Sequence, residues 1–193
     1  MNKIVLASGS PRRKMLLEWA EIPFEVIVSD IDESFPPGTH PADAALLIAK
    51  NKNLAVYNLL STSSPDSERI IISADTIVVL QDEIIGKPND HDHAIEILKK
   101  LSGQKHAVVT AVVMKCTSKE ISFVDTTYVT FNELTEDQIN HYVSHYKPFD
   151  KAGAYAIQEW IGVVGIKSID GDFYNVMGLP ISRVVRMLHS AFS

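Results

Sequence analysis

The chain has 193 residues, of which 46% are hydrophobic and 22% charged, which predicts a soluble globular protein with one domain or one body of two lobes. Its formal net charge of −6 argues against a nucleic-acid partner but leaves room for a pocket that binds a small anion. Cys116 is the single cysteine, and no apolar run reaches membrane length or forms a signal-peptide pattern, so we expect a cytoplasmic protein without a membrane partner.

The first stretch predicts a strand that leads into a helix through a turn of small residues. Residues 3–7 form an apolar run and residues 8–10 read Ser-Gly-Ser. Ser10 suits the N-cap of the helix, and Pro11 suits its first position. The free N–H groups and the positive dipole of such a helix start favour an anion. Arg12 and Arg13 are unfavourable there for the helix alone, which predicts an anionic ligand. The alternative is two solvated arginines on an ordinary helix.

A second strand over residues 24–28 is followed by an acidic loop at 29–34, which predicts a solvated loop or, less often, a metal ligand such as Glu33. A long helix over residues 42–60 carries Lys52 on its apolar face. That lysine either extends to the rim of the face or points into a site that needs a cation.

An almost continuous β-branched run at residues 70–80 predicts a buried strand, or two strands in sequence, interrupted by Asp75. A carboxylate there is costly unless it is paired, binds a metal or lies where the strand reaches a cleft, so we favour a functional role. The alternative is a turn aspartate between two short strands. Lys87 follows a short strand at 83–85, at the tip of a Gly-Lys-Pro turn.

The remaining elements complete an α/β protein whose mixed sheet is flanked by helices. We expect helices at 92–101, 135–145 and 181–192, strands at 107–115, 121–131 and 162–169, and a loop that enters a short strand over 151–158.

Several donors and cations, together with two carboxylates, match the needs of phosphoryl chemistry. The cations would hold a phosphate chain, a metal would neutralise developing charge, and a carboxylate would orient or deprotonate water. These residues are Ser8, Arg12, Arg13, Lys52 and Lys87 with Asp75 and Glu33. A Ser/His/Asp hydrolase is less attractive because no GxSxG elbow is present.

Six segments in order resemble the Maf family of nucleotide pyrophosphatases across nearly the whole chain. They are LASGSPRR at 6–13, IAKNK at 48–52, SADT at 73–76, GKP at 86–88, DKAGAYAIQ at 150–158 and NVMGLP at 175–180. The resemblance implies an inosine-triphosphatase-like fold, with one domain over 1–193 whose two lobes flank a central cleft. It also implies hydrolysis of a nucleoside triphosphate to the monophosphate and pyrophosphate with Mg²⁺ or Mn²⁺, and a possible homodimer.

The resemblance assigns roles to individual residues. Asp75 becomes the catalytic base and, with Glu33, a metal ligand. The triphosphate contacts are Ser8, Arg12, Arg13, Lys52 and Lys87.

Arg12, Thr76 and Gln158 match the subgroup that acts on dTTP and UTP, which implies a house-cleaning role in the nucleotide pool. Glu159 stands where the family usually has glycine, and Lys147 stands where a Gly-Glu-Pro turn is common. Both departures bear on which nucleotide is preferred, so 7-methyl-GTP stays an alternative substrate. A non-catalytic nucleotide-binding regulator of septum formation is the rival function.

Overall fold

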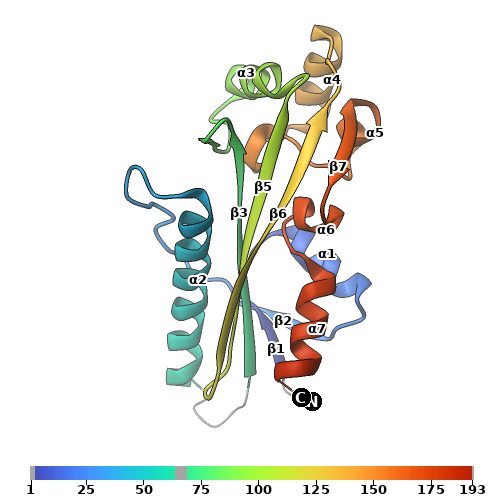
Figure 1. Cartoon of the computed structure of the whole chain (residues 1–193). Helices are drawn as coiled ribbons and strands as arrows, with labels where there is room; N and C mark the ends of the chain where they lie inside the picture. The colour runs from blue at the N-terminus through green and yellow to red at the C-terminus, as the bar shows by residue number, and fades with distance from the viewer. Residues whose placement is uncertain (1–2, 64–68, 193) are drawn as a thin grey trace. The chain divides into compact units, whose positions relative to one another are not determined.

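The structure is a computed structural model that describes residues 3–63 and 69–192 (Figure 1). One seven-stranded mixed sheet has the order β2-β1-β3-β5-β6-β7, with β4 paired to β3, and helices flank it. The predicted α/β fold class is therefore confirmed. The strands are β1 (Lys3–Leu6), β2 (Phe24–Val26), β3 (Arg69–Leu80), β4 (Glu83–Ile85), β5 (Lys105–Lys115), β6 (Glu120–Phe131) and β7 (Ile166–Asp170). The helices are α1 (Pro11–Trp19), α2 (Pro41–Ser63), α3 (His91–Leu101), α4 (Glu136–Tyr146), η1 (Ala152–Ala154), α5 (Trp160–Gly165), α6 (Phe173–Met177) and α7 (Ile181–Ala191).

The chain folds into two compact units. The first contains Met1–Asp75, Thr110–Asp125 and Gly178–Ser193, and the second contains Thr76–Val109 and Thr126–Met177. The central cleft that the sequence suggests stays a prediction.

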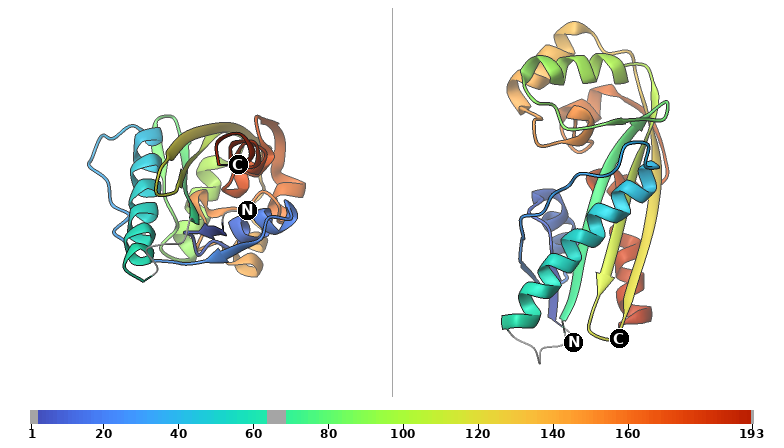
Figure 2. Two further views of the ribbon diagram at one scale, coloured as in Figure 1. Left: turned by 90° about the horizontal axis from the view of Figure 1, so that it is seen from below. Right: turned by 90° about the vertical axis from the view of Figure 1, so that its left-hand side faces the viewer.

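In the first unit, β1 is the parallel partner of both β2 and β3. Ile4 is in register with Phe24 on one side and with Ile70 on the other. The helices α2 and α7 lie on opposite faces of these strands (Figures 1 and 2). Val5 on β1, Val56 on α2 and Ile71 on β3 belong to one buried cluster, which fixes α2 against the sheet.

In the second unit, β4 folds back on β3 through a tight turn at Gln81 and Asp82. Both turn residues have positive φ, as a two-residue hairpin of the right twist requires. The helices α3 and α4 pack against each other. The α3 helix starts at an Asp90 N-cap, and Thr135 and Gln138 form a capping box at the start of α4.

The strand predicted at residues 162–169 is wrong in its first half, because residues 160–165 form α5 and β7 begins at Ile166. The β-branched run suggested a strand, but Gly162 lies against the Ile157 carbonyl, where an added Cβ would be 1.7 Å from the oxygen. This close approach permits a helix that the local pattern does not indicate. The short strand expected near residue 158 is also absent, since residues 152–154 form a 3₁₀ turn and residues 155–158 are not in a strand.

The strand predicted around Asp75 is one continuous element, β3. A turn aspartate between two short strands is therefore the wrong interpretation. The helix predicted at residues 42–60 is longer in the structure, where α2 extends to Ser63.

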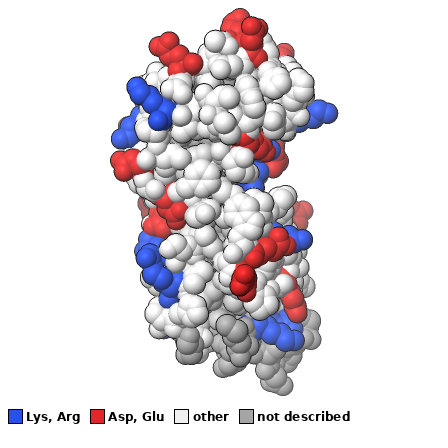
Figure 3. All heavy atoms as spheres, turned by 90° about the vertical axis from the view of Figure 1, so that its right-hand side faces the viewer, with Lys and Arg blue, Asp and Glu red and all other residues white. Residues whose placement is uncertain are grey.

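Among the described residues, no helix is long and apolar enough to cross a membrane. On the face in Figure 3, acidic and basic side chains are interspersed rather than gathered into a basic stripe. The expectation that the chain binds neither nucleic acid nor membrane stays a prediction.

Candidate active site

The turn after β1 forms the helix start that the sequence predicts. Ser10 is the N-cap of α1, Pro11 is its first residue, and the Ser10 hydroxyl accepts the backbone N–H of Arg13 at 3.5 Å. The preceding Ser8 is buried, and its hydroxyl accepts the backbone N–H of Ser10 at 3.3 Å. These contacts hold the Ser-Gly-Ser turn at the carboxyl end of β1.

Arg13 is not a solvated side chain, so that alternative is wrong for it. The residue is 7% exposed, and its guanidinium donates from Nε to the Gly178 carbonyl at 2.8 Å and from Nη1 to the Ser8 hydroxyl at 3.0 Å. Burial lowers the pKa of Arg13, whereas the nearby carboxylates Asp75 and Glu33 oppose this shift. Arg13 thus links the Ser8 turn to the backbone at Gly178. It also places a positive charge near the carboxylates of Asp75 and Glu33. Arg12, one residue before it, is half-buried.

Lys52 joins the two predicted carboxylates. Its Nζ lies 2.7 Å from Asp75 Oδ1 and 2.7 Å from Glu33 Oε1. The side chains of Lys52 and Asp75 are only 15% and 12% exposed, so their pair is shielded from bulk water, while Glu33 is 45% exposed. The predicted cation, base and second acid therefore meet at one point, and Lys52 does not merely extend to the rim of its helix.

Two buried polar residues place Lys52 opposite Asp75. The Asn53 amide donates to the Ile71 carbonyl at 2.9 Å and to the Val113 carbonyl at 3.2 Å, and the Ser73 hydroxyl donates to the Ala49 carbonyl at 2.7 Å. These bonds tie α2 to β3 and β5 next to the ion pair. Our sequence interpretation missed both residues, although an asparagine on an apolar helix face was the available signal.

The acidic loop divides its carboxylates between two tasks. Asp32 accepts the backbone N–H of Ser34 at 2.8 Å and its hydroxyl at 2.7 Å. Those hydrogen bonds lower the pKa of Asp32. Glu33 instead pairs with Lys52, and its role as a metal ligand stays a prediction. Asp32 thus stabilises the loop through Ser34, and Glu33 connects the loop to Lys52 on α2.

In the second unit, the motifs that carry Lys87 and Gln158 are connected. The Gly153 N–H donates to the Gly86 carbonyl at 3.1 Å. Gly153 has φ 71°, and a Cβ there would lie 3.0 Å from a Val78 methyl group, so glycine is required for this approach. Lys87, next to Gly86, is exposed.

Gln158 is half-buried, and its Oε1 atom is buried without a hydrogen-bond partner among the described residues. An orphaned acceptor of this kind fits a ligand that donates one hydrogen bond. Thr76 follows Asp75 on β3, so strand alternation directs the two side chains to opposite faces. The specificity roles of Gln158 and Thr76 stay predictions. That Lys87 and Gln158 belong to the same site as Asp75 also stays a prediction.

The donor set around Lys52 fits a hard divalent cation. In the described ranges, no group of three or more His, Cys, Asp or Glu side chains could hold a metal. Asp75 and Glu33 nevertheless direct carboxylate oxygens at the same point, as their contacts with Lys52 Nζ show. Mg²⁺ commonly takes one or two protein carboxylates and completes its shell with water and substrate phosphates.

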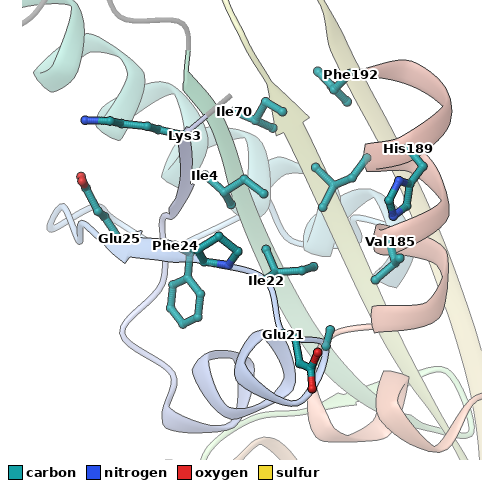
Figure 4. Close-up of a pocket in the computed structure, with 13 residues that line it drawn as sticks. Lys3, Ile4, Glu21, Ile22, Phe24, Glu25, Ile70, Val185, His189 and Phe192 are labelled. Atoms are coloured by element: carbon teal, nitrogen blue, oxygen red, sulfur yellow. The ribbon is translucent and has the colours of Figure 1, made fainter. Parts of the chain in front are cut away.

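A separate pocket of about 810 Å³ lies at the opposite end of the β1 strand from Ser8 (Figure 4). Ile4, Phe24 and Ile70 line it from the strands, and Val185 and His189 line it from α7. In parallel sheets, ligands bind beyond the carboxyl ends of the strands, and this pocket lies at the amino ends. It contains none of the predicted site residues.

Comparison with known proteins identifies the family of this chain. The model of the family described as Maf-like protein matches residues 3–191. The chain belongs to the Maf family.

Two relatives of this Maf chain are similar over almost its whole length. The dTTP/UTP pyrophosphatase of Cytophaga hutchinsonii is 47% identical over 98% of this chain and 84% of its own. The dTTP/UTP pyrophosphatase of Bacillus cereus is 46% identical over 97% of this chain and 95% of its own. Among solved structures, the Staphylococcus aureus Ham1 protein is 15% identical, with a TM-score of 0.43 over 68% of this chain and 73% of that one. That similarity is too low to bear on function.

Proposed function

We propose that this Maf chain hydrolyses dTTP and UTP, including 5-substituted uridine triphosphates, to the nucleoside monophosphate and pyrophosphate. Two relatives at 47% and 46% identity carry the name dTTP/UTP pyrophosphatase, which supports this substrate class. The observation that carries the proposal is the meeting of Asp75, Glu33 and Lys52 in the unit that also contains the Ser8 turn.

In this proposal, Asp75 orients and deprotonates the water that attacks the α-phosphorus. The pyrophosphate that leaves gains negative charge, and cations placed along it stabilise that charge. Ser8 lies two residues before the N-cap of α1, near the free backbone N–H groups of the helix start, and Arg13 donates a hydrogen bond to its hydroxyl. The triphosphate contacts would be Ser8, Arg12, Arg13, Lys52 and Lys87.

A divalent cation, Mg²⁺ or Mn²⁺, would be held by Asp75 and Glu33. When bound, it would neutralise charge on the phosphate oxygens and lower the cost of attack. The convergence of both carboxylates on one point supports this assignment.

The base would be recognised by Gln158, with Thr76 and Arg12 as further specificity residues. The buried, orphaned Oε1 of Gln158 can accept the N3–H of uracil or thymine, while its amide N–H₂ can donate to a ring carbonyl. A purine presents a different edge and would leave these groups unpaired, which disfavours ATP and GTP.

We also propose that the enzyme removes unwanted nucleotides in the cytoplasm and acts as a homodimer, on the basis of the family resemblance. The lone Cys116 agrees with a reducing compartment. Analytical ultracentrifugation would test the dimer directly.

The test of the function is a panel of nucleoside triphosphates with Mg²⁺ or Mn²⁺, in which pyrophosphate and orthophosphate are measured separately. We expect pyrophosphate from dTTP and UTP and little product from ATP and GTP. If 7-methyl-GTP is the best substrate, the reaction class stands and the substrate assignment is wrong. If a triphosphate binds tightly and none is hydrolysed, the regulator of septum formation is the better account.

A further inference from the structure

Lys52 occupies the point at which the carboxylates of Asp75 and Glu33 meet. Its ammonium contacts one oxygen of Asp75 and one oxygen of Glu33, both at 2.7 Å. The backbone around it is held rigidly, because Asn53 and Ser73 tie α2 to β3 through buried hydrogen bonds. The side chain itself is a flexible four-carbon stem with three donors, so it can redirect its charge without movement of the helix.

The carboxylate oxygens that pair with the Lys52 ammonium cannot bind a divalent cation at the same point while the ammonium is there. Without Lys52, Asp75 and Glu33 would place two negative charges around one point, with the Arg13 guanidinium as a nearby cation. With Lys52 present, a metal ion has to displace an ammonium from two ion pairs. A metal ion alone offers nothing to compensate the displaced lysine, whereas a triphosphate offers it new anionic partners.

We infer that Lys52 holds the place of the metal in the nucleotide-free protein and releases both carboxylates when a triphosphate arrives. The ammonium then moves from Asp75 and Glu33 to the phosphate oxygens, and the carboxylates turn to the divalent cation. Metal and nucleotide therefore bind cooperatively, and linkage requires that each raises the affinity for the other by the same factor. This inference rests on the proposed function, since it takes the site to be one for a metal and a triphosphate.

The test measures binding of Mn²⁺ by the loss of its free electron paramagnetic resonance signal, with no turnover involved. The signal lost to the nucleotide analogue alone is measured in a protein-free titration and subtracted. The variants are Lys52→Met and Lys52→Gln, and the control is Lys115→Met. Lys115 pairs with Glu120 at 3.0 Å in the same unit, so this control removes one lysine and one ion pair outside the site. Circular dichroism establishes that each variant is folded.

We expect the wild type and Lys115→Met to bind Mn²⁺ weakly without nucleotide, and about tenfold or more tightly with α,β-imido-dUTP. Whichever Lys52 variant folds should bind Mn²⁺ alone about tenfold more tightly than the wild type, and the gain from the nucleotide analogue should shrink. Equal or weaker Mn²⁺ binding by the folded Lys52 variant would overturn the inference. So would a wild type whose Mn²⁺ affinity is unchanged by the analogue.

Failure of this inference is distinguishable from failure of the proposed function. If dTTP and UTP are not hydrolysed but Lys52→Met still gains affinity for Mn²⁺, the proposed function fails and the place-holding role of Lys52 stands. If both nucleotides are hydrolysed and Lys52→Met gains no affinity, the reverse holds.

Discussion

The hydroxyl of Tyr142 donates a hydrogen bond to the carboxylate of Glu159 and accepts the backbone N–H of Ala156 at 3.1 Å. Glu159 also lies 3.6 Å from the ammonium of the buried Lys151. The segment that carries Gln158 is thus fixed on both sides by one tyrosine–carboxylate pair. Glu159 stands where the family resemblance leads us to expect glycine, so this anchor is a feature of this chain.

Replacing Glu159 should therefore disturb the recognition of the base more than the chemistry. We expect Glu159→Gln to raise KM for dTTP about three- to tenfold with a smaller change in kcat, because Gln158 is less firmly placed. The matched control is Glu136→Gln, which removes the exposed 2.7 Å ion pair with Lys99 in the same unit. An unchanged KM for dTTP in Glu159→Gln would show that this anchor has no part in substrate recognition.

Gln158 itself should determine the preference for pyrimidines. Its buried Oε1 lacks a partner among the described residues, so a pyrimidine N3–H would complete its hydrogen bonding. We expect Gln158→Ala to lower kcat/KM for dTTP and UTP roughly 10- to 100-fold and to leave the poor hydrolysis of ATP nearly unchanged. Steady-state kinetics with all three nucleotides measure this.

The control for that measurement is Gln104→Ala, which makes the same change at an exposed position of the same unit. If Gln158→Ala lowers the rates with dTTP and ATP by the same factor, Gln158 supports the loop and does not select the base.

Arg12 and Lys87 should act on the leaving pyrophosphate. We expect Arg12→Ala and Lys87→Ala each to lower kcat/KM for dTTP at least about tenfold, since charge would grow on the pyrophosphate that these residues are proposed to contact. Arg186→Ala is the control for Arg12, because Arg186 is an exposed arginine of α7 in the same unit. Unaltered kinetics with a lowered melting temperature would return both residues to a structural role.

His106 should make the folded protein sensitive to acid. Its Nε2 lies 2.7 Å from the Tyr155 hydroxyl, its Nδ1 is buried without a partner among the described residues, and burial lowers the pKa of His106 from 6.5 to about 4. Between these two pH values the unfolded chain binds more protons than the folded one, so stability is present above pH 6.5 and is lost as the pH falls toward 4. The contribution lost between pH 7 and 4.5 is about 2 kcal/mol.

Guanidinium chloride unfolding of the wild type and of His106→Gln at both pH values measures this contribution. The variant should be less stable than the wild type at pH 7, and the difference should narrow by about 2 kcal/mol at pH 4.5. A difference that stays the same at the two pH values would show that His106 does not titrate in this range.

The sequence predicts those parts of the site that depend on neighbouring residues. Ser10 as N-cap and Pro11 as first helical residue follow from local chemistry, and the structure has both. The cost of a carboxylate within a β-branched strand indicated Asp75, and the structure supplies the cation that compensates it.

The parts that the sequence does not predict depend on contacts between distant segments. Arg13 is buried because the Gly178 carbonyl, 165 residues along the chain, accepts its Nε–H, and no local pattern reveals that partner. The α5 helix replaces half of a predicted strand because Gly162 packs on the Ile157 carbonyl. In both cases a contact between segments that are not neighbours in a local pattern decides the structure, and local propensity gives either no signal or the opposite one.

We propose Asp75 as the catalytic base of a nucleoside triphosphate pyrophosphatase. The most direct test is pyrophosphate release from dTTP by Asp75→Asn, beside Asp125→Asn as the matched control. Asp125 is half-buried where Asp75 is buried, and like Asp75 it is an ion-paired aspartate of the first unit, but its partner is Arg183. We predict that Asp75→Asn loses at least about 10²-fold in kcat while it stays folded by circular dichroism, and that Asp125→Asn keeps wild-type kcat. Wild-type turnover by Asp75→Asn, with normal metal dependence, would contradict the account.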